Sequence, residues 1–542
     1  MPPATVLAYP ARMIAPPLPA ASVDPELGSG PLRAPGAVLL VSCYELGHQP
    51  IALAGPLATL RAAGFAPVAV DTAVDPLPDA AIAAATLVAI AVPMHTALRL
   101  GVAVAEKVRR RNPAAHVCFY GLYATLNAGH LLGDESRSRG VGESGSTVSD
   151  GREQASRTEP ALPPFSFSTP RLLDSSTRPL ADSVVSGELE PALLALAEAL
   201  DRGEPAEAAA GVGTARRPAA PVLAPLPEGL RGLPPDRRGL PGLRAYARLE
   251  REGTVVPAGA IEATRGCHHT CRHCPIPPIY GGRFFVVPKE VVLADGRAQV
   301  AAGARHLTFT DPDFFNGPGH GLRIMRELRA EFPWLTFDAT IKVEHLLQHR
   351  KRLPELAELG CAFVVTAVES LADAVLTRLD KGHTRADVEA ALALLDGVGV
   401  PMRPSLLPFT PWETLDGYRD LLGWVAERDL VGCVDPVMLA IRLLVPPGSS
   451  LLAEAESAAW LGELDAANFT HRWAHPDPRM DALHRAVAAI VERAAGANEP
   501  AAATFGRIWD AAHETAGLAA MPAPTPPVRR PPALRLTESW FC

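Results

Sequence analysis

The stretch of sequence that decides the fold reads Arg265-Gly266-Cys267-His268-His269-Thr270-Cys271-Arg272-His273-Cys274-Pro275. It places three cysteines at the spacing Cys-x3-Cys-x2-Cys. A [4Fe–4S] cluster is normally held by four cysteine thiolates. Three thiolates leave one iron open to a further ligand, so this spacing predicts a cluster with one exchangeable position.

Structural zinc is the alternative that these residues leave open. Three cysteines and one histidine form a regular tetrahedral zinc set, and His268, His269 and His273 all lie within the stretch. Zinc knuckles usually have two separated halves, whereas this sequence contains no second Cys-x2-Cys pair. The iron–sulfur interpretation is therefore favoured, and it requires a reducing compartment that keeps the thiols free.

The residues around the cysteines predict a strand that leads into a loop. An apolar run over residues 258–263 precedes them, Gly281-Gly282 follows, and a helix is predicted over 288–301. Catalytic loops of β/α barrels follow the carboxyl ends of strands. The alternation of strands and helices continues and predicts a barrel domain over 244–445. Its further predicted strands cover residues 305–310, 335–340, 362–368, 401–407 and 434–439.

The N-terminal part predicts a separate α/β domain over residues 36–203. Uninterrupted apolar strands separated by helices predict a Rossmann-like parallel sheet that is covered on both faces. The predicted strands cover residues 36–43, 67–70, 87–92, 116–120 and 183–185, and the predicted helices cover 50–63, 96–111 and 191–200.

The remaining segments differ from these two domains in composition. Residues 133–179 are rich in Ser, Gly, Arg and Glu, which predicts a disordered insertion before the fifth strand. Residues 204–243 form a Pro-rich linker. Residues 446–520 are predicted to be mostly helical, and 521–542 form a flexible tail that ends in a cysteine.

Composition bounds the function. A chain of 542 residues is too long for one hydrophobic core and predicts two or three domains. A hydrophobic share of 48% with 20% charged residues is typical of a soluble globular protein. The net charge of −8 gives no general attraction to nucleic acid, and the N-terminus is a poor signal peptide. We therefore expect a cytoplasmic protein without a membrane partner, and the composition gives no indication of a nucleic-acid partner.

The cysteine spacing and its strand–loop context resemble the radical S-adenosylmethionine (SAM) superfamily, whose fold is a partial (β/α)6 barrel. The resemblance implies that Cys267, Cys271 and Cys274 hold the cluster, and that SAM chelates the open iron. It also implies reductive cleavage of SAM to a radical that attacks a small molecule or a peptide, with flavodoxin or ferredoxin as electron donor. The substrate and the outcome of the radical reaction are not written in these motifs.

The same resemblance implies roles for residues at the ends of other barrel strands. His273 takes the place of an aromatic residue beside the adenine, and Asp311 or Asp313 would accept from the SAM ammonium group. Aspartates there also commonly stabilise turns. Glu369 corresponds to the position that receives the ribose hydroxyls. On the fifth strand, where a charged residue commonly pairs with a neighbouring carboxylate, the weaker candidates are Arg403 and Ser405.

The N-terminal domain resembles the cobalamin-binding-type domain that precedes the barrel in one class of radical SAM enzymes. The resemblance rests on topology and on Val185-Ser186-Gly187-Glu188, and it implies cobalamin as a further cofactor. Domains that bind cobalt through a histidine carry Asp-x-His-x-x-Gly after the first strand, whereas this chain reads Tyr44-Glu45-Leu46-Gly47-His48-Gln49-Pro50. We therefore expect His48 to bind cobalamin weakly or not at all. The alternative function is a zinc-stabilised α/β binding protein without catalysis.

The last residues resemble a radical SAM subfamily whose tails carry Cys-Cys or Cys-selenocysteine followed by Ala-Glu-Pro. They read Leu536-Thr537-Glu538-Ser539-Trp540-Phe541-Cys542. The resemblance predicts that Cys542 is the first residue of that pair and that the gene continues through a UGA codon. Cys542 would then be a mobile thiol that binds a soft metal or quenches a radical, and it would otherwise be an incidental terminal thiol.

Overall fold

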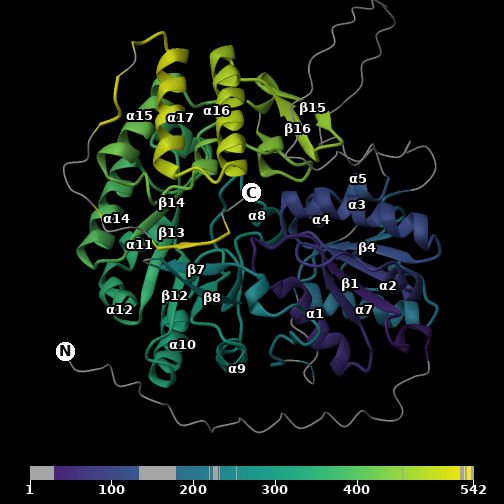
Figure 1. Cartoon of the computed structure of the whole chain (residues 1–542). Coiled ribbons are helices and arrows are strands. Elements are labelled where there is room, and N and C mark those ends of the chain that lie inside the picture. Colours follow the sequence, from purple (N-terminus) through teal and green to yellow (C-terminus); the bar gives the residue numbers. More distant parts are fainter. Residues whose placement is uncertain are drawn as a thin grey trace, which may run out of the picture.

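Two α/β domains lie side by side, the N-terminal one in purple and blue and the second in teal and green (Figure 1). The computed structural model describes residues 30–133, 179–218, 220–223, 230, 232–251, 253–454, 456–519, 521–524, 530 and 534–538. The predicted insertion over 133–179 falls almost entirely outside these residues, and so does Cys542. No described helix is both long enough and apolar enough to cross a membrane.

The N-terminal domain is built on a six-stranded sheet in the order β2-β1-β3-β4-β5-β6. Neighbouring strands are parallel, except that β6 is antiparallel to β5. The five parallel strands confirm the prediction, whereas the edge strand β6 lies inside the predicted linker. The strands are β1 (Val38–Ser42), β2 (Val68–Asp71), β3 (Leu87–Ala91), β4 (His116–Tyr120), β5 (Ser183–Val185) and β6 (Val212–Gly213).

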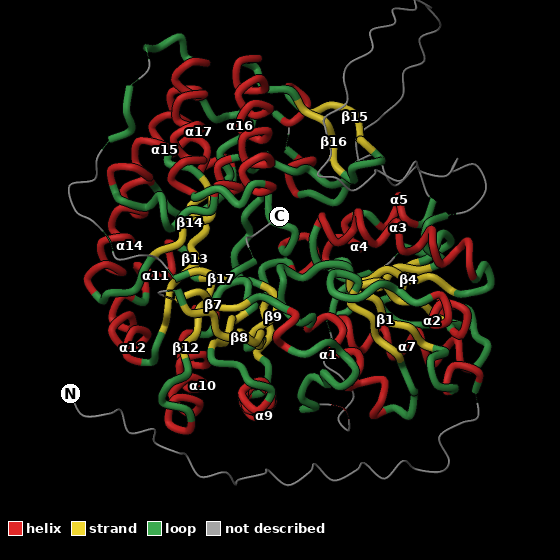
Figure 2. Tube along the Cα trace, viewed as in Figure 1, coloured by secondary structure: helices red, strands yellow, loops and turns green. Residues whose placement is uncertain are grey.

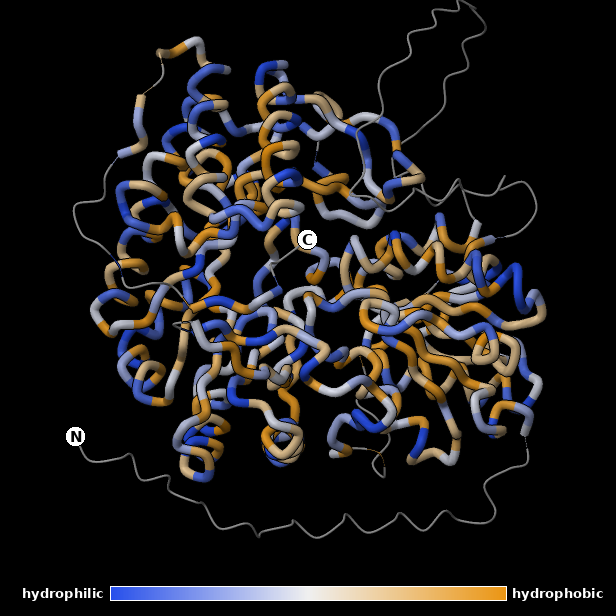
Figure 3. Tube along the Cα trace, viewed as in Figure 1, coloured by the Kyte–Doolittle hydropathy of each residue, from blue (hydrophilic) through white to orange (hydrophobic). Residues whose placement is uncertain are grey.

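Helices bury both faces of this sheet. Successive side chains of a strand point to opposite faces, so a strand covered on both sides must be apolar throughout. Leu40 of β1 accordingly packs in one apolar cluster and its neighbour Leu39 in another, and the strands are orange in Figure 3. Helices α1 (Ile51–Ala62) and α7 (Leu189–Asp201) contribute to the first cluster, and α2 (Asp79–Ala84) and α3 (His95–Arg111) to the second. Two short helices follow β4, namely α4 (Leu122–Leu126) and α5 (Ala128–Leu131).

The second domain holds a seven-stranded sheet in the order β14-β13-β12-β11-β8-β7-β17. Five of its strands are parallel to one another, namely β8, β11, β12, β13 and β14. The other two strands, β7 and β17, are antiparallel to their neighbours. This curled sheet confirms the predicted partial barrel. The strands are β7 (Arg248–Arg251), β8 (Thr254–Ile261), β11 (His306–Phe309), β12 (Thr336–Thr340), β13 (Cys361–Glu369), β14 (Met402–Leu406) and β17 (Arg535–Leu536).

Helices on the outside of the sheet complete the β/α units. The apolar side chains of α10, α14 and α15 form one core with outward-facing residues of the strands, such as Leu307, Val364 and Met402. The helices are α9 (Lys289–Ala301), α10 (Pro318–Glu331), α11 (Val343–Gln348), α12 (Leu353–Glu358), α13 (Asp373–Arg378), α14 (Arg385–Gly397) and α15 (Leu415–Glu427). A short excursion after β8 contains β9 (Thr264–Gly266), α8 (Pro277–Tyr280) and β10 (Phe284–Val286).

The predicted sixth strand over 434–439 is wrong. Residues Pro436–Leu439 form a short 3-10 helix instead. Pro436 has no backbone N–H and a fixed φ, so it suits the first turn of a helix better than a ladder of strand hydrogen bonds. In the described sequence after β14, a single parallel bridge between Phe409 and Arg442 continues the sheet direction.

The C-terminal region combines two helices with a hairpin. Helices α16 (Pro478–Gly496) and α17 (Ala501–Thr515) fulfil the helical prediction. The hairpin of β15 (Leu461–Asp465) and β16 (Thr470–Trp473) does not, because its alternation of polar and apolar residues is too weak to identify from the sequence. It is held by Trp473, whose ring lies 3.5 Å from the guanidinium carbon of Arg442.

A segment near the end of the chain crosses the open side of the barrel. Residues 534–538, the closing segment, contain β17, which pairs with β7 at one edge of the sheet (Figure 2). At the opposite edge, Arg403 of β14 donates to the backbone oxygen of Leu534 over 3.2 Å. Leu534 and Leu536 pack against Phe363 and other residues of the concave face. The closing segment therefore joins the two edges of the partial barrel.

Candidate active site

The cysteine loop lies where β8 and β9 end, at the carboxyl end of the barrel strands. Cys267 and Cys271 are buried and Cys274 is partly exposed. Gly266 enters the loop with a φ of 75°, and a Cβ there would come 2.6 Å from the backbone oxygen of Arg283, so only glycine fits. The backbone N–H of Arg272 donates to Leu379 over 3.0 Å, which ties the loop to the segment after β13.

The loop cysteines are not part of the compact group of metal-ligating side chains found among the described residues. That group has all its ligand atoms within 4.8 Å and consists of His268, His269 and His345. The three loop cysteines carry free thiols, which suit an iron–sulfur cluster and a zinc ion alike.

Glu369 lies beside this loop in a strained conformation. It follows a register shift in β13 and has a φ of 65°, in the left-handed region that non-glycine residues seldom occupy. Its Oε1 atom is 3.1 Å from Nζ of Lys381 and 3.4 Å from Nε2 of His273. Burial alone would raise the pKa of Glu369, but Lys381 and His273 hold it well below its usual range. The structure thus brings the predicted residues His273 and Glu369 together.

The two aspartates after β11 differ in their surroundings. Asp311 accepts from the Ala263 backbone over 2.9 Å and from the Thr264 hydroxyl over 2.6 Å, and burial raises its pKa to about 7. It stabilises the turn before the cysteine loop. Asp313 accepts from the Phe315 backbone over 2.9 Å, and its other oxygen faces the histidines of the loop. Asp313 is therefore the aspartate that remains directed toward the cysteine loop.

Arg403 and Ser405 lie elsewhere on the sheet. Arg403 forms a 2.9 Å ion pair with Asp435 and stacks over Phe363. Together with Ser405 it lines a small cleft beside the closing segment. No contact recorded for the described residues joins either side chain to the cysteine loop, and Arg403 has the neighbouring carboxylate that commonly accompanies a charged residue in a strand.

His48 faces the barrel. The side chain is 6% exposed, and burial lowers its pKa to about 4, with Asp338 of β12 and His306 of β11 acting on its charge. His306 in turn lies 2.7 Å from Asp338. The loop after β1 therefore inserts His48 into the boundary between the domains, toward buried polar groups of the barrel sheet.

Comparison with known proteins identifies the second domain. Residues 261–422 match the family model described as "Radical SAM superfamily". This chain contains a radical SAM domain. The match begins in β8, includes all three loop cysteines and ends in α15, and it confirms the resemblance seen in the cysteine spacing.

Curated relatives of the chain come from more than one group. The ribosomal protein uS12 methylthiotransferase RimO of Geobacter sulfurreducens is 27% identical over 180 residues, which cover 31% of this chain and 39% of that protein. The hopanoid C-3 methylase of Methylococcus capsulatus is 25% identical over 185 residues, 34% of this chain and 35% of that enzyme. The chain thus spans about two fifths or less of the length of these relatives.

One solved structure resembles both domains of the chain. The cobalamin-dependent SAM radical enzyme OxsB, with aqua-cobalamin bound, superposes with a TM-score of 0.58 at 13% identity. The superposition covers 83% of this chain and 66% of that one. At this identity the likeness shows a shared fold: a Rossmann-like domain that precedes a radical SAM barrel.

Sequence reasoning missed two features of the radical SAM domain. Lys381 is buried beside Glu369 and the cysteine loop. Arg265, directly before the loop, forms ion pairs with Glu190 over 2.6 Å and with Glu188 over 3.1 Å. Those two carboxylates follow β5 of the N-terminal domain, so the entry to the cysteine loop is fixed to the other domain. No pairing signal in the sequence points to this contact.

Proposed function

We propose that this protein is a radical SAM enzyme in which Cys267, Cys271 and Cys274 hold a [4Fe–4S] cluster. The observation that carries the proposal is the position of these cysteines, two of them buried, on a loop at the carboxyl end of the barrel strands in a radical SAM domain. The cluster and SAM, when bound, supply reductive cleavage of the sulfonium and a radical that abstracts hydrogen from a substrate. We further propose a cytoplasmic setting with flavodoxin or ferredoxin as the electron donor.

The side chains around the loop bind and orient in this proposal. Lys381 places a buried cation beside Glu369 and near Cys271 and Cys274, which lowers the cost of gathering negative charge away from water. Glu369 offers an ionised carboxylate to ribose hydroxyls, and the partly buried His273 lies next to it.

The substrate class remains small molecule or peptide. The names of the relatives point in two directions, because RimO acts on a ribosomal protein and the hopanoid methylase on a hopanoid. Each alignment covers the minority of both chains, so the radical chemistry is proposed for this chain without either substrate.

We also propose that His48 is not a cobalt ligand. The ring is buried against the barrel, and Glu45 of the same loop accepts from the backbone N–H groups of Ile51 and Ala52 at the start of α1. These groups are therefore committed within the protein. Cobalamin would have to bind this domain without axial ligation from His48, in keeping with the missing Asp-x-His-x-x-Gly pattern.

Metal analysis of anaerobically purified protein tests the proposal. After reconstitution we expect about four irons and four sulfides per chain, a brown colour and SAM-dependent spectral change. Zinc at about one per chain with no iron uptake would favour the zinc-stabilised binding protein instead.

A further inference from the structure

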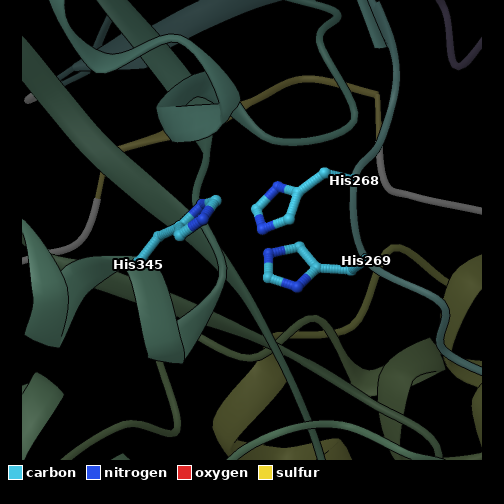
Figure 4. A group of neighbouring side chains, drawn as sticks. All are labelled: His268, His269 and His345. Atoms are coloured by element: carbon cyan, nitrogen blue, oxygen red, sulfur yellow. The ribbon is translucent and has the colours of Figure 1, made fainter. Parts of the chain in front are cut away.

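Three imidazoles converge beside the cysteine loop. His268 and His269 lie between Cys267 and Cys271. His345 lies on α11, the helix that follows β12 (Figure 4). One ligand nitrogen from each ring lies within 4.8 Å of the others. The ring centroids of His269 and His345 are 4.6 Å apart, so the rings are neighbours.

Two of these rings have buried nitrogens that the protein does not satisfy. His345 is 3% exposed, and its Nδ1 atom has no hydrogen-bond partner; the same holds for Nε2 of His269, whose side chain is 9% exposed. A buried polar atom without a partner costs about 1–3 kcal/mol. Two such atoms side by side point to a missing ligand.

A carboxylate completes the group. Asp313 Oδ2 lies 2.8 Å from Nδ1 of His345 and 3.8 Å from Nε2 of His269, without hydrogen-bonding geometry to either. Two donor atoms that share one metal ion at bonds of about 2.0–2.2 Å are separated by roughly 2.8–3.5 Å. The pair of His345 and Asp313 already has this separation.

Outer contacts orient the rings as they do at metal centres. The Nδ1–H of His268 donates to Oδ1 of Asn316 over 3.1 Å, which leaves Nε2 as the free lone pair. Nδ1 of His269 lies 3.5 Å from a carboxylate oxygen of Glu344 and leaves Nε2 directed at the group. His268 is exposed, so an ion has access from solvent.

We propose that His268, His269 and His345, with Asp313, bind a divalent first-row transition metal ion such as zinc or ferrous iron. Imidazole and carboxylate ligands suit these ions, whereas magnesium and calcium prefer oxygen alone. The site is separate from the proposed cluster, because it uses no cysteine. A bound ion would link the cysteine loop to α11 and so hold the loop in place before and after the cluster is assembled.

Cobalt uptake by the cluster-loaded full-length protein tests the site. Co²⁺ is the probe because its visible absorption reports the ligands. We expect about one cobalt per chain beyond the iron, with bands of nitrogen and oxygen ligation and no thiolate charge-transfer band. His345→Ala should weaken the Kd for cobalt at least about tenfold, with the iron content unchanged. His345→Gln, which keeps more of the side-chain volume, repeats the measurement if the alanine variant does not fold.

His349→Ala is the matched control. His349 caps the same helix, its ring centroid lies 5.4 Å from that of Phe315 and 5.6 Å from that of His345, and it is not one of the proposed ligands. It should bind cobalt like the wild type. Equal loss in both variants, or equal binding in both, overturns the proposal.

The triple variant Cys267→Ser/Cys271→Ser/Cys274→Ser separates this proposal from the proposed function. It should lose iron and keep cobalt. Loss of both metals, together with a thiolate band in the wild-type spectrum, would assign the cobalt to the cysteines and overturn the histidine site. A cobalt site that survives in a protein that never takes up iron would leave this proposal standing and remove the other.

Discussion

The carboxyl ends of the two parallel sheets differ in what their polar side chains do. In the N-terminal domain, Glu45 caps α1 and Gln49 donates to Pro241 over 2.8 Å, so these groups are used within the protein. In the barrel, His269 and His345 keep unsatisfied nitrogens, and Glu369 is held at a φ of 65°. Open α/β sheets and barrels both bind ligands at this end. The loop after β1 also has a positive φ, 51° at Leu46, and Ser42 Oγ at the end of β1 lacks a partner. What distinguishes the barrel end is that its unsatisfied and strained groups are ionisable side chains beside the cysteine loop.

The largest effect should come from the three loop cysteines. Cys267→Ala/Cys271→Ala/Cys274→Ala should lose the cluster and all SAM cleavage, because no other described cysteine lies on this loop. Iron analysis and detection of 5′-deoxyadenosine measure both losses. The controls are Cys361→Ala and Cys433→Ala, single changes at isolated buried cysteines. Loss of the cluster in Cys361→Ala would show that the ligands have been misassigned.

Replacing Glu369 should weaken SAM binding while the cluster still assembles. The loss of a hydrogen bond to a charged group costs about 1.5–3 kcal/mol, or roughly 10- to 150-fold in affinity. Calorimetry on cluster-loaded Glu369→Gln measures the change. Asp435→Asn, which alters a paired carboxylate next to β14, should bind SAM like the wild type. Unchanged affinity in Glu369→Gln would remove the ribose role.

The stability of the N-terminal domain should depend on pH through Glu45. Burial raises the pKa of Glu45 to about 8. A carboxyl whose pKa is raised by folding stabilises the protein fully below its ordinary pKa of about 4.3, and this contribution is lost as pH rises to about 8. Glu45→Gln removes this titrating group. The Tm of the variant, measured relative to the Tm of the wild type, should therefore rise as the pH is raised from about 5 to about 8. The same change at exposed Glu358 is the control, and a pH-independent difference would contradict the prediction.

The smallest effect is expected at His48. Reduced protein reconstituted with hydroxocobalamin should give the same electron paramagnetic resonance spectrum in the wild type and in His48→Ala, because the ring faces Asp338 and His306. Nitrogen hyperfine splitting that disappears in the variant would prove His48 to be a cobalt ligand. The comparison between the two sheet ends would then fail, since both would carry a metal ligand.

Strands buried on both faces were the most predictable part of the molecule. Their apolar runs identify β1, β3 and β4 to within a residue or two, because helices cover both faces of the sheet and apolar side chains are needed on each face. The segment at 434–439 has equally apolar residues. It forms a 3-10 helix instead of a strand, because it contains Pro436 and follows the last strand of the parallel sheet. Apolar content alone therefore does not distinguish a last strand from a packed turn.

The cluster cysteines were predictable because they are close in sequence, and the histidine group was not. His268 and His269 were visible beside the cysteines, but their partner His345 comes from a helix two β/α units further on. Pairing Glu369 with Lys381 required the turn after β13 to bring them together. Chemistry assembled from separate strand ends depends on register and crossing, which a single sequence does not specify.

The closing segment also bears on the order in which the protein is made. Residues 534–538 leave the ribosome after every barrel strand, so β7 lacks its β17 partner until then. Glu538 also reaches the N-terminal domain, 3.5 Å from the Tyr44 hydroxyl. During synthesis the concave face around Phe363 and Val365 is therefore uncovered. The concave side of the barrel is thus open to solutes until the closing segment packs across it.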